Sequence, residues 1–114
     1  MRKIVYCLCA VVIAFLTANL LACTQTSVLP HFNENESYSS VRLKMVEAGW
    51  EPFHAKDAAI CTEGDMRCEG RPEMHACAGA GMANCKFLWK KEEKMTAICT
   101  IGDFAVFDSV CEQI

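Results

Sequence analysis

Six cysteines between positions 61 and 111 constrain the fold of this chain more than any other feature of its sequence. The chain has only 114 residues, and a domain of this size lies near the lower limit at which a hydrophobic core suffices for stability. An even number of cysteines in an oxidising compartment predicts three disulfides, each stabilising the fold by about 2–4 kcal/mol. The sequence alone leaves their pairing open. The candidates are Cys61, Cys68, Cys77, Cys85, Cys99 and Cys111.

Residues 1–22 have the layout of a secretory signal, which would direct the chain to an oxidising compartment outside the cytoplasm. The basic pair Arg2 and Lys3 precedes an apolar run from Ile4 to Leu16, and the small residue Ala22 suits a cleavage site. We therefore expect residues 1–22 to be a signal peptide and the mature chain to fold outside the cytoplasm.

The tetrapeptide Leu20–Cys23 (LLAC) resembles the lipobox of bacterial lipoproteins. In that family the cysteine is acylated and becomes the new N-terminus, so the resemblance implies lipidation of Cys23 and a membrane as partner through the acyl chains. It implies localisation in the bacterial cell envelope, and Thr24 in place of an aspartate favours the outer membrane, on its periplasmic or its surface face. Two alternatives stay open: cleavage without a lipid, and an uncleaved anchor, because residues 4–22 are about long enough to span a bilayer.

The charge of the mature chain argues against nucleic acid as a partner. Two of the 11 Lys and Arg residues lie in the signal and all 14 Asp and Glu residues lie after it, which leaves nine against fourteen and a net charge of −5. Binding to nucleic acid depends on clustered Lys and Arg that meet the phosphates. No such basic stripe is present, so we expect no nucleic-acid partner.

A tether followed by a helix opens the mature chain. Residues 23–36 are polar, contain Pro30 and have little periodic apolar content, which predicts a lipidated N-terminus and a flexible tether. The domain would then span residues 37–114. Ser37 or Ser39 can cap a helix over residues 38–48, and Gly49 suits its C-terminal cap. The apolar residues at helical spacing are Tyr38, Val41, Met45 and Ala48.

The second half of the chain changes from turn signals to strand patterns. Residues 53–76 contain strong turn signals and predict an irregular excursion held by disulfides. Residues 84–90 predict a strand with Cys85, Phe87 and Trp89 on one face. A charged loop over residues 90–94 precedes two further strands.

Those two strands, residues 95–101 and 104–111, flank Gly102-Asp103, which predicts a hairpin with a two-residue turn. Ile101 would then lie opposite Phe104, and Cys99 opposite Val106. A Cys99–Cys111 bridge would require the tail after Ser109 to curl back. The fold class predicted from these patterns is α+β, with one N-terminal helix packed on a three-stranded antiparallel meander in a small disulfide-stapled domain.

Short motifs across the folded part resemble a layout found in small uncharacterised secreted proteins of bacteria. They are Gly49–Pro52 (GWEP), Cys77–Gly81 (CAGAG) and Cys85–Trp89 (CKFLW), which follow a GWxP, CxGxG and CxFxW pattern. The resemblance implies the helix and meander, and a Cys77–Cys85 bridge around a glycine-rich loop. It implies no activity.

Metal and thiol chemistry have weak support in the sequence. Cys61, Cys68, His75 and Cys77 are donor types that zinc accepts, but no C-x-x-C pair is present, and such thiols would sooner pair in an oxidising compartment. His75 lies two residues from Cys77 and could activate it as a nucleophile only if that thiol were free. We therefore expect no metal and no cofactor.

The remaining feature is a set of aromatic residues on a small rigid scaffold. A sheet covered by one helix has a second face, and Trp89 or Phe104 would form an apolar contact patch there. Our first hypothesis is a lipid-anchored interaction module rather than an enzyme, such as an inhibitor or an envelope accessory, with an unknown protein partner. The alternative is a small extracytoplasmic enzyme or metal-binding protein that uses His75 with a free cysteine. The number of free thiols distinguishes the two.

Overall fold

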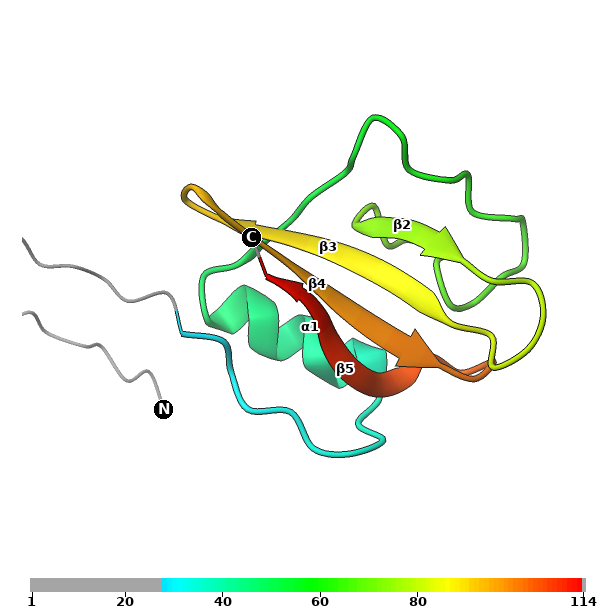
Figure 1. Ribbon diagram of the computed structural model, residues 1–114, viewed down its shortest axis with the longest axis horizontal. Helices are drawn as coiled ribbons and strands as arrows, with labels where there is room; N and C mark the ends of the chain where they lie inside the picture. The colour runs from blue at the N-terminus through cyan, green and yellow to red at the C-terminus, as the bar shows by residue number, and fades with distance from the viewer. Residues whose placement is uncertain (1–27, 114) are drawn as a thin grey trace, which may run out of the picture.

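The computed structural model describes residues 28–113, which form one helix and an antiparallel sheet (Figure 1) and contain three disulfides. The α+β, disulfide-rich class is therefore confirmed. The predicted signal over residues 1–22 and the predicted acylation site Cys23 lie outside the described residues. Among residues 28–113, no helix has the length and apolar character needed to cross a membrane.

The helix α1 (Tyr38–Glu47) begins and ends close to where the sequence predicts. The Ser37 hydroxyl accepts a hydrogen bond from the Ser40 N–H at 3.3 Å, and Gly49 takes the left-handed conformation with φ +85° that a glycine adopts most readily. The helix was predicted to pack on one face of the sheet, and in the structure its first residue is also bonded to the end of the sheet. The Tyr38 N–H donates to the carbonyl of Ala105 at 2.9 Å, so the start of α1 is joined to the turn at one end of the sheet.

The sheet has five strands, so the prediction of three was wrong. Two short strands lie end to end along the outer edge of the third, giving the order β1-β3-β4-β5 with β2 also paired to β3. They escaped prediction because two and four residues are too few to show a period. The strands are β1 (Glu51–Pro52), β2 (Met74–Cys77), β3 (Cys85–Lys91), β4 (Lys94–Ile101) and β5 (Val106–Gln113).

The connection between β4 and β5 also differs from the expected two-residue turn. Ile101 pairs with Val106, so four residues, 102–105, form the loop. Ala105 is fully buried in the core and has φ +50°, whereas its neighbour Phe104 is exposed in the loop. The prediction of Phe104 as a strand residue opposite Ile101 was therefore wrong.

All six candidate cysteines are paired, and each bridge is local in the sequence. The bridges are Cys61–Cys68, Cys77–Cys85 and Cys99–Cys111, with separations of 7, 8 and 12 residues. The Cys77–Cys85 bridge agrees with the resemblance noted above. The register shift between Ala97 and Ile98 leaves Cys111 as an extra residue on β5, and this bulge lets it reach Cys99 without a curled tail.

Part of the expected tether packs on the domain. Leu29 and Phe32 lie partly buried against the core, and the rings of Phe32 and Phe107 are 5.0 Å apart. The Lys44 ammonium donates to the carbonyl of His31 at 3.1 Å. This part of the predicted tether therefore contacts the domain, because burying its apolar side chains is favourable.

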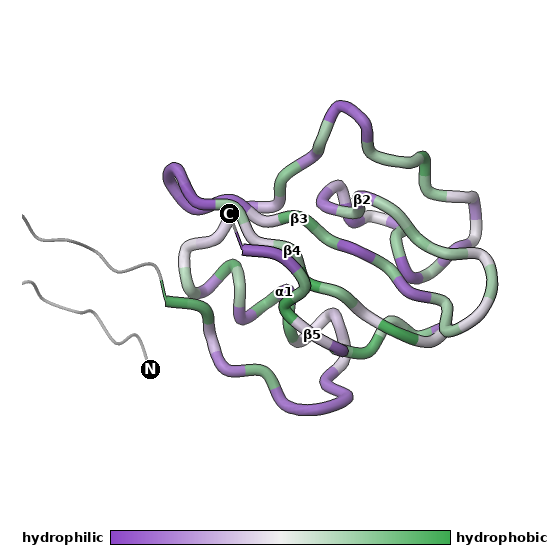
Figure 2. Tube along the Cα trace, in the orientation of Figure 1, coloured by the Kyte–Doolittle hydropathy of each residue, from purple (hydrophilic) through white to green (hydrophobic). Residues whose placement is uncertain are grey.

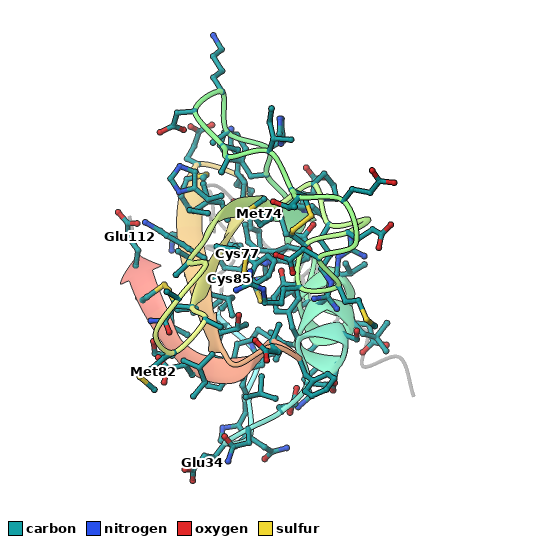
Figure 3. All side chains as sticks on the ribbon, turned by 90° about the vertical axis from the view of Figure 1, so that its right-hand side faces the viewer. Glu34, Met74, Cys77, Met82, Cys85 and Glu112 are labelled. Carbon is teal, nitrogen blue, oxygen red and sulfur yellow. A yellow bond between two sulfur atoms is a disulfide. The ribbon has the colours of Figure 1, made fainter. Side chains whose placement is uncertain are left out.

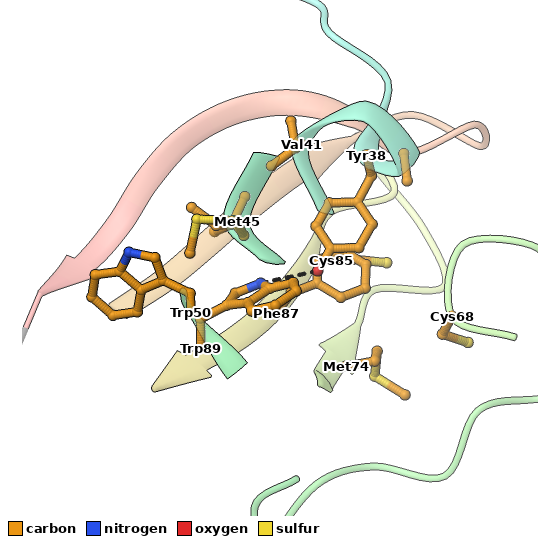
Figure 4. Packing of buried hydrophobic residues seen from close by; sticks show 11 residues of the cluster. Tyr38, Val41, Met45, Trp50, Cys68, Met74, Cys85, Phe87 and Trp89 are labelled. Carbon is orange, nitrogen blue, oxygen red and sulfur yellow. Dashed lines mark hydrogen bonds between the residues drawn. The ribbon is translucent and has the colours of Figure 1, made fainter. Parts of the chain in front are cut away.

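The core lies between α1 and one face of the sheet (Figure 4). The Tyr38 ring stacks on Phe87 with centroids 3.8 Å apart, and Trp89 Nε1 donates to the Tyr38 hydroxyl at 3.1 Å. Cys85, Phe87 and Trp89 share one face of β3, as the alternation predicts, and all three are buried on the helix side. The prediction of Trp89 as an interaction residue was therefore wrong, because its side chain lies on the face of β3 that packs against α1. By contrast, the turn between β3 and β4 at the edge of the molecule is hydrophilic (Figure 2).

A carboxylate is buried beside this aromatic core. Glu73 is fully buried, and its Oε1 accepts hydrogen bonds from Arg42 Nε at 2.6 Å and from the Tyr38 hydroxyl at 3.0 Å. Burial first, and the Glu73 charge second, raise the pKa of Tyr38, which therefore stays protonated. The hydrogen bond to Glu73 also raises the pKa of Arg42. This network joins the irregular segment to both α1 and β3.

We predict that Glu73→Gln lowers the free energy of unfolding by roughly 2–3 kcal/mol, because it removes the charge that Arg42 and Tyr38 are arranged to meet. Denaturant unfolding measures this. The matched control is Glu112→Gln, which breaks the surface pair with Lys86 and should cost less than about 1 kcal/mol. Equal effects of the two substitutions would contradict a central role for Glu73.

Candidate functional site

Three loops meet at one end of the sheet: the segment around residues 64–67, the loop between β2 and β3, and the turn between β4 and β5. Together they surround a hollow of about 340 Å³. In Figure 1 they lie at the right, at the end where β3 begins and β4 ends. We call this the loop surface. Its lining residues are Gly64, Asp65, Met66, Arg67, Ala78, Gly79, Ala83, Asp103 and Phe104.

The loop surface displays large apolar side chains to solvent. Met66 is 73% exposed, Met82 is 66% exposed and Phe104 is 85% exposed. Figure 3 looks onto this end of the molecule and shows Met82 at the rim, beyond the Cys77 and Cys85 pair. Single exposed apolar residues are common, but three on adjoining loops are typical of a contact surface.

Backbone hydrogen bonds hold Phe104 in its exposed position. The Ala105 N–H donates to the Gly102 carbonyl at 3.0 Å, and the Gly102 N–H donates to the carbonyl of Met82 at 2.8 Å. The second bond joins the β4–β5 turn to the loop between β2 and β3. With Ala105 also accepting from Tyr38, the turn has fixed partners on both sides, so Phe104 is presented by a rigid base.

Arg67 fastens the loop between β2 and β3 to the irregular segment. Its Nη1 donates to the carbonyls of Ala78 at 2.8 Å and Ala83 at 3.2 Å. Its Nε and Nη2 donate to the two carboxylate oxygens of Asp65 at 2.9 and 2.6 Å. The Cys77–Cys85 bridge closes the same loop at its base. A disulfide and a guanidinium therefore hold a loop that has only seven residues, 78–84, between its cysteines.

The ion pair at the loop surface has shifted protonation equilibria. The hydrogen bonds from Arg67 hold the pKa of Asp65 below its usual value, against the opposing effect of burial. The same contact raises the pKa of Arg67, and the nearby charge of Asp103 adds to this. Both groups are therefore charged at neutral pH. The hollow contains two carboxylates and one guanidinium, a net charge of −1.

His75 lies in a different place, on the face of the sheet opposite α1. Its Nε2 is 3.2 Å from an oxygen of Asp57, and it lines a second hollow of about 220 Å³ together with Leu88, Met95 and others. Cys77 is bonded to Cys85, so the structure does not present a thiol to His75. Within residues 28–113, no group of three or more His, Cys, Asp and Glu side chains is arranged to hold a metal ion.

Comparison of the chain with protein-family models, with curated proteins and with solved structures found no match.

Phe104 and the Cys77–Cys85 loop were predicted from the sequence, whereas Met66, Met82 and the Asp65–Arg67 pair were not. The spacing of Asp65 and Arg67 within a turn-rich segment is a weak signal for a local ion pair. The exposure of the two methionines had no sequence signal, because Met45 and Met74 are buried in the same fold.

From the ion pair of Asp65 and Arg67, we predict that the loop between β2 and β3 is destabilised by acid. Because the pKa of Asp65 is lower in the folded protein than its usual value of 3.8, the pair stabilises the fold fully above that value and is lost as the pH falls through the lower, folded pKa. Carboxyl ¹³C titration should give a midpoint below 3.8, and the protection of the amides in residues 78–84, measured relative to their intrinsic exchange rates at each pH, should fall as Asp65 is protonated.

The control for this titration is Asp65→Asn, which should show the lower protection of residues 78–84 at every pH, whereas the unmodified protein should reach it only once Asp65 is protonated. A midpoint for Asp65 at or above the usual value, or a loop that exchanges equally in the two proteins, would contradict the role assigned to the pair.

Proposed function

We propose that this chain is a lipid-anchored protein-interaction module of the bacterial cell envelope, and that the loop surface is its contact site. The observation that carries the proposal is the exposure of Met66, Met82 and Phe104 on three loops fastened to one another. Exposed apolar area of this kind costs solvation free energy in the free protein, which a partner would recover on binding.

Rigidity supports this reading. Binding costs free energy when loops and side chains must be ordered, and a surface that is ordered beforehand avoids much of that cost. The Cys77–Cys85 bridge, the Arg67 hydrogen bonds and the Gly102–Met82 bond each restrict one of the loops. The role would be that of an inhibitor of an extracytoplasmic enzyme or of an accessory in envelope assembly.

The arrangement of the domain suits an anchor at its N-terminal side. The described chain begins at the left of Figure 1, beside the C-terminal end of α1, whereas the loop surface lies at the right. Acyl chains on Cys23, only five positions before Val28, would attach the side of the domain away from the loops. A protein held in this way would offer the loop surface to a partner rather than to its own membrane.

The alternative function, an enzyme or metal-binding protein that uses His75, requires at least one reduced cysteine. We predict that the protein extracted from membranes and alkylated without reduction has a mass that begins at Cys23, includes acyl chains and carries no alkyl group. Intact-mass spectrometry reports all three features. A mass without lipid would contradict the anchor, and an alkylated thiol would support the His75 alternative.

Site-specific cross-linking tests the loop surface directly. We predict that a photoreactive residue at position 82 of the full-length chain forms a discrete protein adduct in the cell envelope, and that Phe104→Ala reduces its yield severalfold because the neighbouring contact is lost. Leu43→Ala is the matched control, since Leu43 is 60% exposed on α1 and lies outside the loop surface. Equal losses with the two substitutions, or no adduct at all, would contradict the proposed contact site.

A further inference from the structure

We propose that the partner protein inserts an arginine or lysine side chain into the hollow between Met66 and Phe104. This inference rests on the proposed function and names the chemistry that the loop surface recognises. It follows from the charge of the hollow, from the side chains that form its walls and from the hydrogen bonds that Arg67 already makes.

The charge of the hollow favours a cation. Asp65 and Asp103 line it together with Arg67, which leaves one negative charge without a cation. Asp103 makes no hydrogen bond or ion pair with another described side chain. Its carboxylate is therefore the acceptor that an incoming ammonium or guanidinium would meet.

Arg67 is poorly placed to bind an anion. Its Nε and Nη2 are directed at Asp65, and its Nη1 is directed at two backbone carbonyls. An acidic or phosphorylated partner would thus face the excess negative charge of the hollow and would have to displace bonds that hold the loop. A wholly apolar partner would desolvate the Asp103 carboxylate without giving it a new hydrogen bond.

The walls of the hollow match the stem and the head of a basic side chain. The Phe104 ring can attract a cation over its face, and the Met66 thioether is a polarisable, adaptable contact. Arginine and lysine carry long apolar stems that pack on such groups. Gly64 and Gly79 leave open space in the lining, because a side-chain carbon built at either position would meet nothing within 4 Å.

A titration with a small basic probe tests the inference on the full-length, lipidated chain in detergent micelles. The probe is N-acetyl-arginine amide, and its matched control is N-acetyl-citrulline amide, which has nearly the same shape without the charge. Methyl NMR of the methionines reports the location. We expect a saturable shift of Met66 with arginine, little shift with citrulline, and no shift of the buried Met45.

Variants identify the groups responsible. Asp103→Asn should weaken binding of the arginine probe about two- to fivefold, the range for an exposed ion pair, Phe104→Leu should also weaken it, and Glu112→Gln should leave it unchanged. Equal shifts with citrulline, a shift confined to Met95 in the second hollow, or unchanged binding by Asp103→Asn would overturn the inference.

Cross-linking from position 82 separates this inference from the proposed function. Loss of the adduct in Asp103→Lys with recovery in Asp103→Glu supports a basic partner residue. An adduct that persists in Asp103→Lys overturns the basic partner but leaves the interaction module standing. No adduct in any variant overturns both.

Discussion

The rest of the fold depends on the hydrogen bonds that join the buried residue Glu73 to α1 and to β3. Its carboxylate accepts hydrogen bonds from Arg42 and Tyr38 on α1, while its backbone carbonyl accepts from the Leu88 N–H of β3 at 2.8 Å. The disulfides cannot replace these bonds, because each joins cysteines no more than 12 positions apart and none joins the helix to the sheet. They stiffen local segments, whereas the Glu73 network and the aromatic core join those segments to one another.

The loop surface is connected to this network through two arginines. Arg71 packs over the Tyr38 ring at 4.8 Å, donates to the Ser39 hydroxyl, and donates to the backbone carbonyl of Arg67 at 2.7 Å. Arg67 in turn fastens the loop between β2 and β3. A continuous set of contacts therefore runs from the core to the exposed end, and it explains how a small domain can hold apolar side chains in solvent without letting them collapse onto the core.

The elements that could be predicted from sequence are those with a period of their own. Ten residues of α1 and seven of β3 are long enough for their apolar spacing to identify type and face. The two short strands on the edge of β3 are too short to show such a spacing. The turn before β5 could not be predicted either, because its shape depends on burying Ala105. Phe104 was predicted to be a contact residue on an open sheet face, yet it reaches solvent from a turn.

The sequence by itself determined the helix, its caps, the placement of Cys85, Phe87 and Trp89 on one face of β3, and the presence of enough cysteines to stabilise a small domain, because each depends on residues close together in the chain. Only the tertiary structure decided that Trp89 is buried, that Asp65 and Arg67 join the loop after β2, and that Met66, Met82 and Phe104 share one end of the molecule. These outcomes depend on contacts between distant segments. Their free energy comes from packing and from partners for buried polar groups, which no local pattern records.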